Sequence, residues 1–184
     1  MPNLQQLRSK IYDRVTLGTL LDKVKAVQQG LQTGEYMREA LRPREQLIMS
    51  HQYQQLFDGK ASNGEDIRPY YTEDIKPRGY FRSRESAERY AQWKLNGIPY
   101  PYRADRNPDA PNLYITGKFH EELGIKFLQD TIVIGAKTIY AANIVAKYGL
   151  GTFGLTGDNW GVILRENGVY KDILQSMVEE LNNG

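Results

Sequence analysis

The chain has 184 residues, the length of one ordinary domain, and a formal net charge of only +2. It contains no cysteine, which excludes disulfide bonds, thiolate metal ligands and a cysteine nucleophile. The small charge argues against a general polyanion binder, and no stretch approaches the roughly 18 apolar residues of a membrane span. Because residues 1–4 lack the pattern of a signal peptide, we expect synthesis in the cytoplasm of the producing cell.

Helices are predicted for most of the N-terminal third. Apolar side chains recur at steps of three and four over residues 3–30, with Gly30 and Gly34 as stops. A second helical stretch over residues 35–57 contains Pro43, which we expect in the first turn after a break. We interpret residues 1–57 as an N-terminal helical arm.

Residues 58–112 are predicted to form an irregular connector with one helix. Ser83 is a suitable N-cap for that helix, over about 83–96. Four prolines within residues 98–112 predict a long irregular loop. Irregular backbone leaves N–H and C=O groups that need partners, so we expect residues 58–72 and 98–112 to contact other chains.

The last third has the clearest patterning. Apolar and polar side chains alternate over residues 125–135 and predict a β-hairpin. Amphipathic helices are predicted at 137–148 and 170–181, and a shorter one after Thr116. We therefore predict an α+β fold, in which a small antiparallel sheet is covered by helices. Residues 113–184 form its α+β core, and the N-terminal helices and the long irregular loop lie outside it.

The hydrophobic core is expected within residues 113–181, and folding is expected to depend on it more than on the N-terminal helices. Truncation of Ile134 or Leu174 to alanine should then cost roughly 2–5 kcal/mol. The apolar side chains of residues 3–30 are spread over more than one helix face, which indicates a helix that waits for a neighbour's surface. Deletion of residues 1–30 should leave a folded protein that assembles poorly.

The motifs argue against an enzyme. Residues 149–154 match G-x-G-x-x-G, but a helix rather than a strand is predicted before them, so we reject a dinucleotide site. His51 and His120 lie too far apart to suggest a metal site by their spacing. Adjacent Glu121 and Glu122 point in different directions on a helix, which favours a solvated face over an acid–base pair. We expect no catalysis, no cofactor, no metal and no small-molecule substrate.

Basic and aromatic side chains are mixed over residues 78–94. The cluster comprises Arg78, Arg82, Arg84, Arg89, Tyr90, Trp93 and Lys94. Such mixtures can clamp phosphates and stack on bases. They are equally typical of protein–protein interfaces, and a plain mixture of surface and core is a third interpretation.

The sequence around Thr116-Gly117 and Phe119 resembles the "Thr-Gly-x-aromatic" element of phage head–tail connector and tail-completion proteins, the virion-morphogenesis group. A hairpin, a "Tyr-Ala" helix and a glycine loop follow in that group, and the corresponding residues here are Gly135, Tyr140, Gly149 and Phe153. The resemblance spans residues 55–184. The interface candidates are therefore Thr116, Gly117, Phe119, Gly135, Tyr140, Gly149 and Phe153, with Arg78, Arg82 and Arg84 from the basic cluster.

The resemblance implies a structural virion protein of a tailed bacteriophage, either a neck or head–tail connector subunit or a tail-completion subunit. Such subunits form a homo-oligomeric ring through which DNA passes, and they contact portal, neck and tail proteins. Non-specific contact with genomic DNA in the lumen is left open. The implied location is the virion, after synthesis in the host bacterial cytoplasm, with no membrane contact.

Two alternatives belong to other functional classes. A nucleic-acid-binding accessory protein would use the cluster at residues 78–94 and would bind DNA in a salt-dependent way. An enzyme with a hidden site would show a deep pocket that holds a carboxylate or histidine with a strongly shifted pKa. Positive charge is concentrated in residues 1–112 and the remainder is mildly acidic. This distribution suits packing between neighbouring subunits or a loose approach to nucleic acid, and a randomly mixed surface is the third interpretation.

Overall fold

The computed structural model describes residues 17–73, 83–96, 106–114, 116–129, 131–139 and 141–182. Over these residues the fold is mostly helical with a small two-stranded antiparallel sheet, which confirms the α+β class. In chain order the described elements are α2 (Leu17–Gln32), α3 (Glu35–Leu41), the 3-10 turn η1 (Arg42–Arg44), α4 (Glu45–Phe57), α5 (Arg84–Leu95), α6 (Lys118–Glu121), β1 (Leu123–Phe127), β2 (Ile132–Ala136), α7 (Ala141–Tyr148), the 3-10 turn η2 (Leu150–Thr152), α8 (Gly157–Gly161), the π-helical turn η3 (Val162–Glu166) and α9 (Val169–Asn182).

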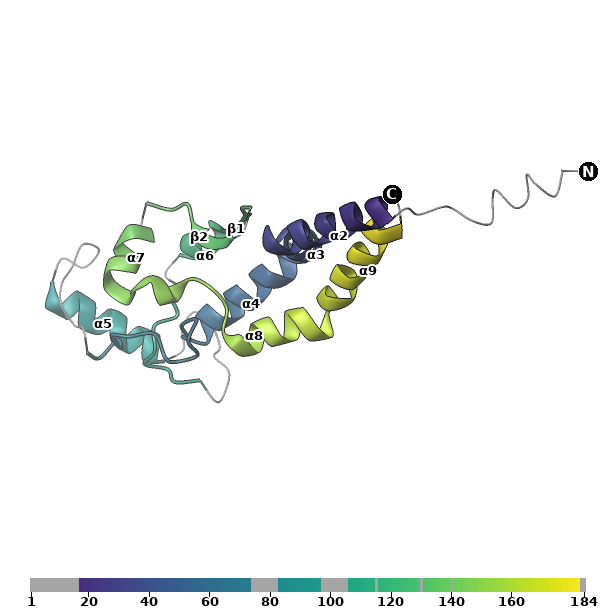
Figure 1. The fold of residues 1–184 in the computed structure, drawn as a ribbon. Helices are drawn as coiled ribbons and strands as arrows, with labels where there is room; N and C mark the ends of the chain where they lie inside the picture. The colour runs from purple at the N-terminus through teal and green to yellow at the C-terminus, as the bar shows by residue number, and fades with distance from the viewer. Residues whose placement is uncertain are drawn as a thin grey trace, which may run out of the picture.

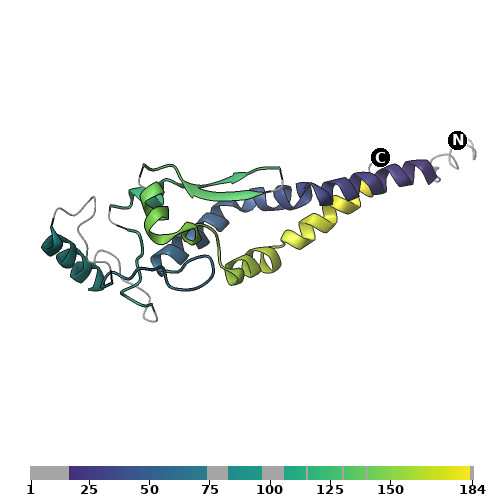
Figure 2. The same cartoon turned by 60° about the vertical axis from the view of Figure 1, so that its left-hand side comes forward.

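Helices α2 and α9 lie side by side and form an arm that projects from the body of the molecule (Figure 1, Figure 2). Helix α2 begins at the tip of this arm and α9 ends there, so the two helices run antiparallel. Near the tip, Lys23 Nζ donates a hydrogen bond to the carbonyl oxygen of Leu181 at 3.0 Å. Helix α5 lies at the opposite end of the molecule (Figure 2), which gives the described chain an elongated shape.

The predicted helix stop at Gly30 is wrong, because α2 runs through it to Gln32. Gly30 is needed for packing: a Cβ atom there would lie 2.6 Å from Cε2 of Tyr36. The other predicted stop, Gly34, is confirmed: the chain turns there with a φ of 68°, which favours glycine. Pro43 lies in η1, at the expected break between the helices α3 and α4.

Two hydrophobic clusters form the core, and α4 contributes to both. The first core comprises Ala40, Leu41, Ile48, Leu155, Ile163 and Val169. The second core comprises Met49, Leu56, Ile67, Phe119 and Leu123. Helix α4 runs between the β-hairpin and α8 (Figure 1, Figure 2), so it can bury side chains on more than one side.

The expectation of a core within residues 113–181 is therefore wrong. Ile48 and Leu56 of α4 are completely buried, and α4 supplies one side of each core. The segment interpreted as an N-terminal arm consequently has two parts. Residues 40–57 contribute to the core of the body, whereas α2 projects with α9.

Two buried glutamines attach α4 to the glycine-rich segment after α7. Gln52 accepts a hydrogen bond from the Gly154 backbone N–H at 2.9 Å and donates to the Thr152 carbonyl oxygen at 3.3 Å. Gln55 accepts from the Thr156 backbone N–H at 2.8 Å and donates to the Gly154 carbonyl oxygen at 2.9 Å. These side chains satisfy buried backbone groups that have no partner in a helix or sheet ladder.

The predicted hairpin is confirmed. Strand β1 pairs with β2 in a register that places Ile125 opposite Ile134 and Phe127 opposite Ile132. All four side chains pack against the first core, as expected for one face of a sheet. The covering layer differs from the prediction, because α4 covers this face together with elements from the C-terminal third.

The irregular segments 58–73 and 106–114 pack against each other. The Tyr71 backbone N–H donates to the Asp109 carbonyl oxygen at 3.0 Å, and Gly59 approaches Ala110 so closely that a Cβ would lie 2.8 Å from the alanine Cβ. Their irregular backbone thus finds partners within the chain, which removes the physical reason for expecting contacts with other chains there. Residues 98–105 of the second predicted segment lie outside the described residues.

Candidate interaction surface

The Thr-Gly-aromatic motif forms a turn that anchors a core side chain. Gly117 has a φ of 86° and precedes α6, and a Cβ there would lie 3.0 Å from the Tyr114 hydroxyl oxygen. Phe119 follows in the second core, whereas Thr116 is exposed. The conformation of Gly117 and the burial of Phe119 give the motif a structural role within the subunit.

The remaining motif residues lie around the same hairpin and core. Gly135 is opposite Gly124 in the sheet, and Gly149 ends α7 with a φ of 82°. The Phe153 ring packs against the Phe119 ring, with centroids 6.0 Å apart. Tyr140 lies outside the described residues. The structure thus brings Phe119 and Phe153 together as packing residues rather than as an exposed interface.

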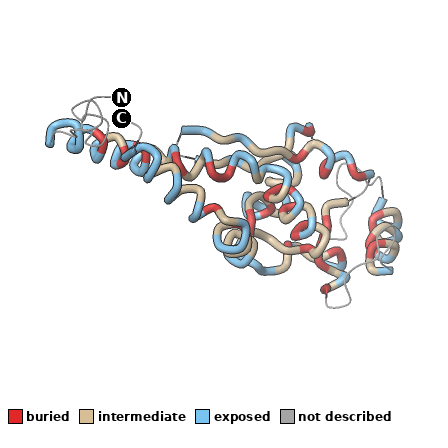
Figure 3. The backbone as a smooth tube through the Cα atoms, turned by 90° about the vertical axis from the view of Figure 1, so that its right-hand side faces the viewer, coloured by how far each residue is buried: buried red, intermediate tan, exposed pale blue. Residues whose placement is uncertain are grey.

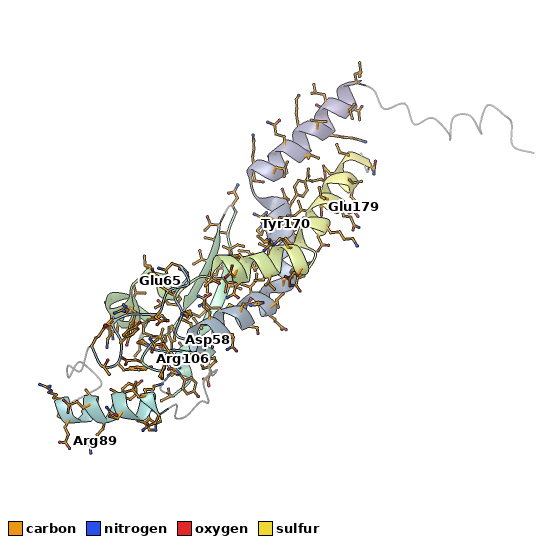
Figure 4. All side chains as sticks on the ribbon, turned by 90° about the horizontal axis from the view of Figure 1, so that it is seen from below. Asp58, Glu65, Arg89, Arg106, Tyr170 and Glu179 are labelled. Carbon is orange, nitrogen blue, oxygen red and sulfur yellow. The ribbon has the colours of Figure 1, made fainter. Side chains whose placement is uncertain are left out.

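The basic cluster does not form a continuous basic surface along α5. Arg84 is exposed, but its Nε donates to Glu88 Oε1 at 2.8 Å. Lys94 at the other end of the helix is completely buried. Arg78 and Arg82 lie outside the described residues, whereas Arg89 projects from α5 at the far end of the molecule (Figure 4).

Lys94 occupies a cage of aromatic rings. Its Nζ donates to Asn112 Oδ1 at 2.8 Å and to the carbonyl oxygen of Tyr114. Four ring centroids lie 5.7–6.0 Å from Nζ, those of Tyr71, Tyr90, Trp93 and Tyr114. Burial and, to a lesser extent, the charge of Arg106 together lower the pKa of Lys94 to about 7. These contacts fix α5 to the segment around residues 112–114.

His120 lies beside this cage in a stack of rings. Its imidazole is 4.7 Å from the Phe57 ring and 6.4 Å from the Tyr53 ring, centroid to centroid. Burial and, to a lesser extent, the charge of Lys94 together lower its pKa to about 4. Sequence reasoning missed both groups, because their partners come from segments distant in sequence.

Two open hollows lie elsewhere on the described surface. One is lined by Lys60, Asp66, Arg68, Tyr70, Tyr148 and neighbouring loop residues. Burial would raise the pKa of Asp66, but hydrogen bonds from Lys60, Asn107 and Tyr70 outweigh it and lower the pKa. Because these groups already bond to one another, they serve to hold the loop together.

The other hollow is lined by His51, Gln55, Asp58, Lys60, Thr156, Asp158 and adjacent residues. His120, the histidine with the shifted pKa, lines neither of these two hollows. Within the described ranges no group of three or more histidine, aspartate or glutamate side chains is placed to hold a metal ion.

The largest set of exposed apolar side chains lies on the α2–α9 arm. We define the arm face by these residues: Leu17, Leu20, Leu21, Val24 and Leu31 of α2, with Tyr170, Leu174, Val178 and Leu181 of α9. Leu17 is 87% exposed and Leu174 is 61% exposed. Figure 3 shows the arm as mostly exposed, and Figure 4 shows side chains projecting from both helices, with Tyr170 labelled on α9.

Helical geometry places these side chains on one side of the arm. Successive residues turn about 100° around an α-helix. Viewed from the arm tip, the exposed apolar residues of α2 lie a quarter turn clockwise from its buried residues Lys23, Val27 and Gly30. From the same viewpoint, the exposed apolar residues of α9 lie a quarter turn counterclockwise from Val169 and Ile173, which face the first core. The two rotations have opposite senses, as two antiparallel helices require if they are to present their apolar side chains on one side of the arm.

Comparison with known proteins identified no relative of the chain. No protein-family model, no curated protein and no solved structure matches the chain. Across the described residues, no helix combines the length and the apolar character that crossing a bilayer requires.

Proposed function

We propose that the chain is a structural subunit of an oligomeric assembly, and that this assembly is the neck or tail-completion ring of a tailed-phage particle. The observation that carries the assembly role is the arm face. Large exposed apolar patches on soluble proteins mark sites of interaction, since water disfavours their exposure. A projecting pair of helices with one apolar side is suited to reaching a neighbouring subunit.

The specific phage assignment is supported by the resemblance at Thr116, Gly117 and Phe119 and by the elements that follow. The matching residues form a turn, a hairpin and a glycine-rich loop in the expected order. Structural roles within the subunit fit a protein whose motif preserves shape rather than chemistry. The proposed partners are copies of the same chain and portal, neck and tail proteins.

The nucleic-acid alternative is less well supported by the geometry. Lys94 is enclosed by aromatic rings and cannot reach a phosphate, and Arg84 is paired with Glu88. The cluster at residues 78–94 therefore provides fewer exposed cations in its described part than its sequence indicates. Electrostatic attraction to phosphates needs such cations.

The proposed function is tested by where the chain is found and by its mass. Purified phage particles from the cell that encodes the chain should contain it in multiple copies, measured by quantitative mass spectrometry. Light scattering should detect self-association of the purified chain, alone or with its neck partners. A strict monomer that is also missing from purified particles would rule the proposal out.

A further inference from the structure

We infer that the arm face binds the arm face of a second copy of this chain, so that two α2–α9 pairs form a four-helix contact. This inference rests on the proposed function, since it names the surface through which copies meet. It concerns the described residues 17–32 and 169–182.

The first argument is geometric. Two antiparallel helices with apolar stripes on the same side form half of a four-helix bundle, in which each stripe is covered by helices of the other half. A second copy supplies a half with the same spacing and the same stripes. Its Leu, Val and Tyr side chains can therefore pack between those of the first copy as ridges into grooves.

The second argument is the size of the surface. A 16-residue helix such as α2 is about 24 Å long. Two neighbouring helices with axes 8–10 Å apart present a face about 20 Å wide. Each copy thus contributes about 480 Å², and a pair buries about 1,000 Å², the lower limit of a specific interface. The contact should be weak between two isolated copies and strengthened where several copies assemble.

The third argument is charge. The exposed apolar residues of the arm face are adjacent to one another, and the exposed lysines Lys25 and Lys171 lie by helical spacing at its edge, where two copies can meet without burying a charge. A nucleic acid or an acidic membrane would require basic residues in the face itself. Lys25 is the lysine of α2 nearest to the arm face. It is largely exposed, and its Nζ lies 3.7 Å from Oδ1 of Asp22. Helical spacing puts Lys25 at the edge of the arm face, where polar residues surround the apolar centre of an interface.

The body is wider than the arm (Figure 1, Figure 2), which favours overlapping arms that point in opposite directions with the bodies at the two ends. In that arrangement a twofold axis passes near the middle of the arm face, so the contact joins two copies, or two rings, and is separate from the head-to-tail contact that closes a ring. Val24 is central in the exposed stripe of α2, between Leu17 and Leu31. The Val24 residues of the two copies should therefore lie close together.

The first experiment measures self-association of the full chain by sedimentation over a range of concentrations. The variant Leu20→Gln/Leu174→Gln changes the arm face, and Gln29→Ala/Gln175→Ala changes exposed residues on other sides of the same helices. We expect the arm-face variant to weaken dimerisation at least about tenfold and the control to match wild type. Equal association of all three proteins, or a monomeric wild type at every concentration, would overturn the inference.

The second experiment does not depend on disrupting the interface. Since the chain has no cysteine, Val24→Cys and Gln29→Cys each introduce a single thiol. A short bismaleimide should crosslink the Val24→Cys protein into dimers and leave the Gln29→Cys protein largely monomeric. Equal crosslinking of the two proteins would contradict the proposed contact.

Two further outcomes separate this inference from the proposed function. If the chain is present in particles but self-associates through another surface, the inference fails and the proposed function stands. If the arms dimerise but the chain is missing from particles, the proposed function fails and the inference stands. A chain that dimerises only after deletion of residues 1–16 would overturn the inference, because its own N-terminal segment would then cover the face.

Discussion

The Asn112 side-chain oxygen is a junction of three hydrogen bonds. It accepts from Lys94 Nζ at 2.8 Å, from the Tyr71 hydroxyl at 3.1 Å and from the Tyr114 backbone N–H at 3.1 Å. The lysine thus has two oxygen acceptors and four aromatic rings around its ammonium group. Desolvation disfavours its ammonium form and the rings favour it, so its charge depends on a close balance.

Replacing Lys94 by methionine should change how stability depends on pH. The pKa of Lys94 is about 7 in the fold and 10.5 in an unfolded chain, so the unfolded chain binds more protons between these values. The wild-type free energy of unfolding should then rise with pH across this window, by up to about 1.4 kcal/mol per pH unit. Urea unfolding between pH 7 and 9 should show this rise in wild type and a smaller one in Lys94→Met.

Lys94→Met serves as the control, because it lacks the titrating lysine and retains the other titrating side chains of the chain. At pH 7 the methionine variant should be at least as stable as wild type, because a well-packed apolar side chain often replaces a buried charge without loss. Identical pH dependence in the two proteins would show that Lys94 has the same proton affinity folded and unfolded.

His120 should make the fold sensitive to acid. Its pKa is about 4 in the fold against 6.5 in an unfolded chain, so unfolded chains bind more protons between these values. The free energy of unfolding should fall by about 3 kcal/mol as the pH falls from 6.5 to 4. His120→Phe should lose less stability than wild type between pH 7 and 4.5 in urea unfolding. An unchanged loss would assign the acid sensitivity to other groups.

At the scale of elements, α4 is the structural centre of the body. Ile48 is completely buried in the first core, so Ile48→Ala should cost about 2–5 kcal/mol in urea unfolding. Leu174→Ala, which the sequence pattern predicts to be equally costly, should cost less than about 1 kcal/mol, because Leu174 is 61% exposed. If Leu174→Ala lowered the free energy of unfolding more than Ile48→Ala, the packing of the arm would contribute more to stability than the first core.

Local patterns predicted the elements better than their packing. The alternation through Ile125 and Ile134 identified the hairpin, and Ser83 identified the start of α5, where its Oγ accepts from the Ser86 backbone N–H at 3.2 Å. The central position of α4 was missed because Gln52 and Gln55 look like solvent-facing residues. Their hydrogen-bonding partners lie about a hundred residues away, beyond any local periodicity.

The candidate surfaces show the same limit. Lys94 looks like part of an exposed basic cluster, because lysine is rarely completely buried. Its aromatic cage includes Tyr71 and Tyr114 from separate loops, which no spacing along α5 could indicate. By contrast, the distribution of apolar residues over more than one face of residues 3–30 did predict unburied apolar side chains, and the described part of that helix has them.

At the scale of the whole molecule, body and arm should respond differently to truncation. The two cores contain no residue before Ala40, so deletion of residues 1–30 should leave a folded body. The deletion removes most of α2 and hence half of the arm face, so assembly should be lost. Circular dichroism and light scattering of the deletion variant test the two parts separately. An unfolded variant would show that α2 is required for the fold itself.

The first core also has a consequence for synthesis. Ile48 packs with Leu155, Ile163 and Val169, so the central helix leaves the ribosome long before its partners exist. At about 5–20 residues per second, the roughly 100 intervening residues take on the order of 5–20 seconds to translate. Throughout that time the nascent chain carries uncovered isoleucine and leucine side chains, the substrates that chaperones bind. Translation speed and chaperone supply should therefore limit the yield of soluble subunit more than the final stability of the fold.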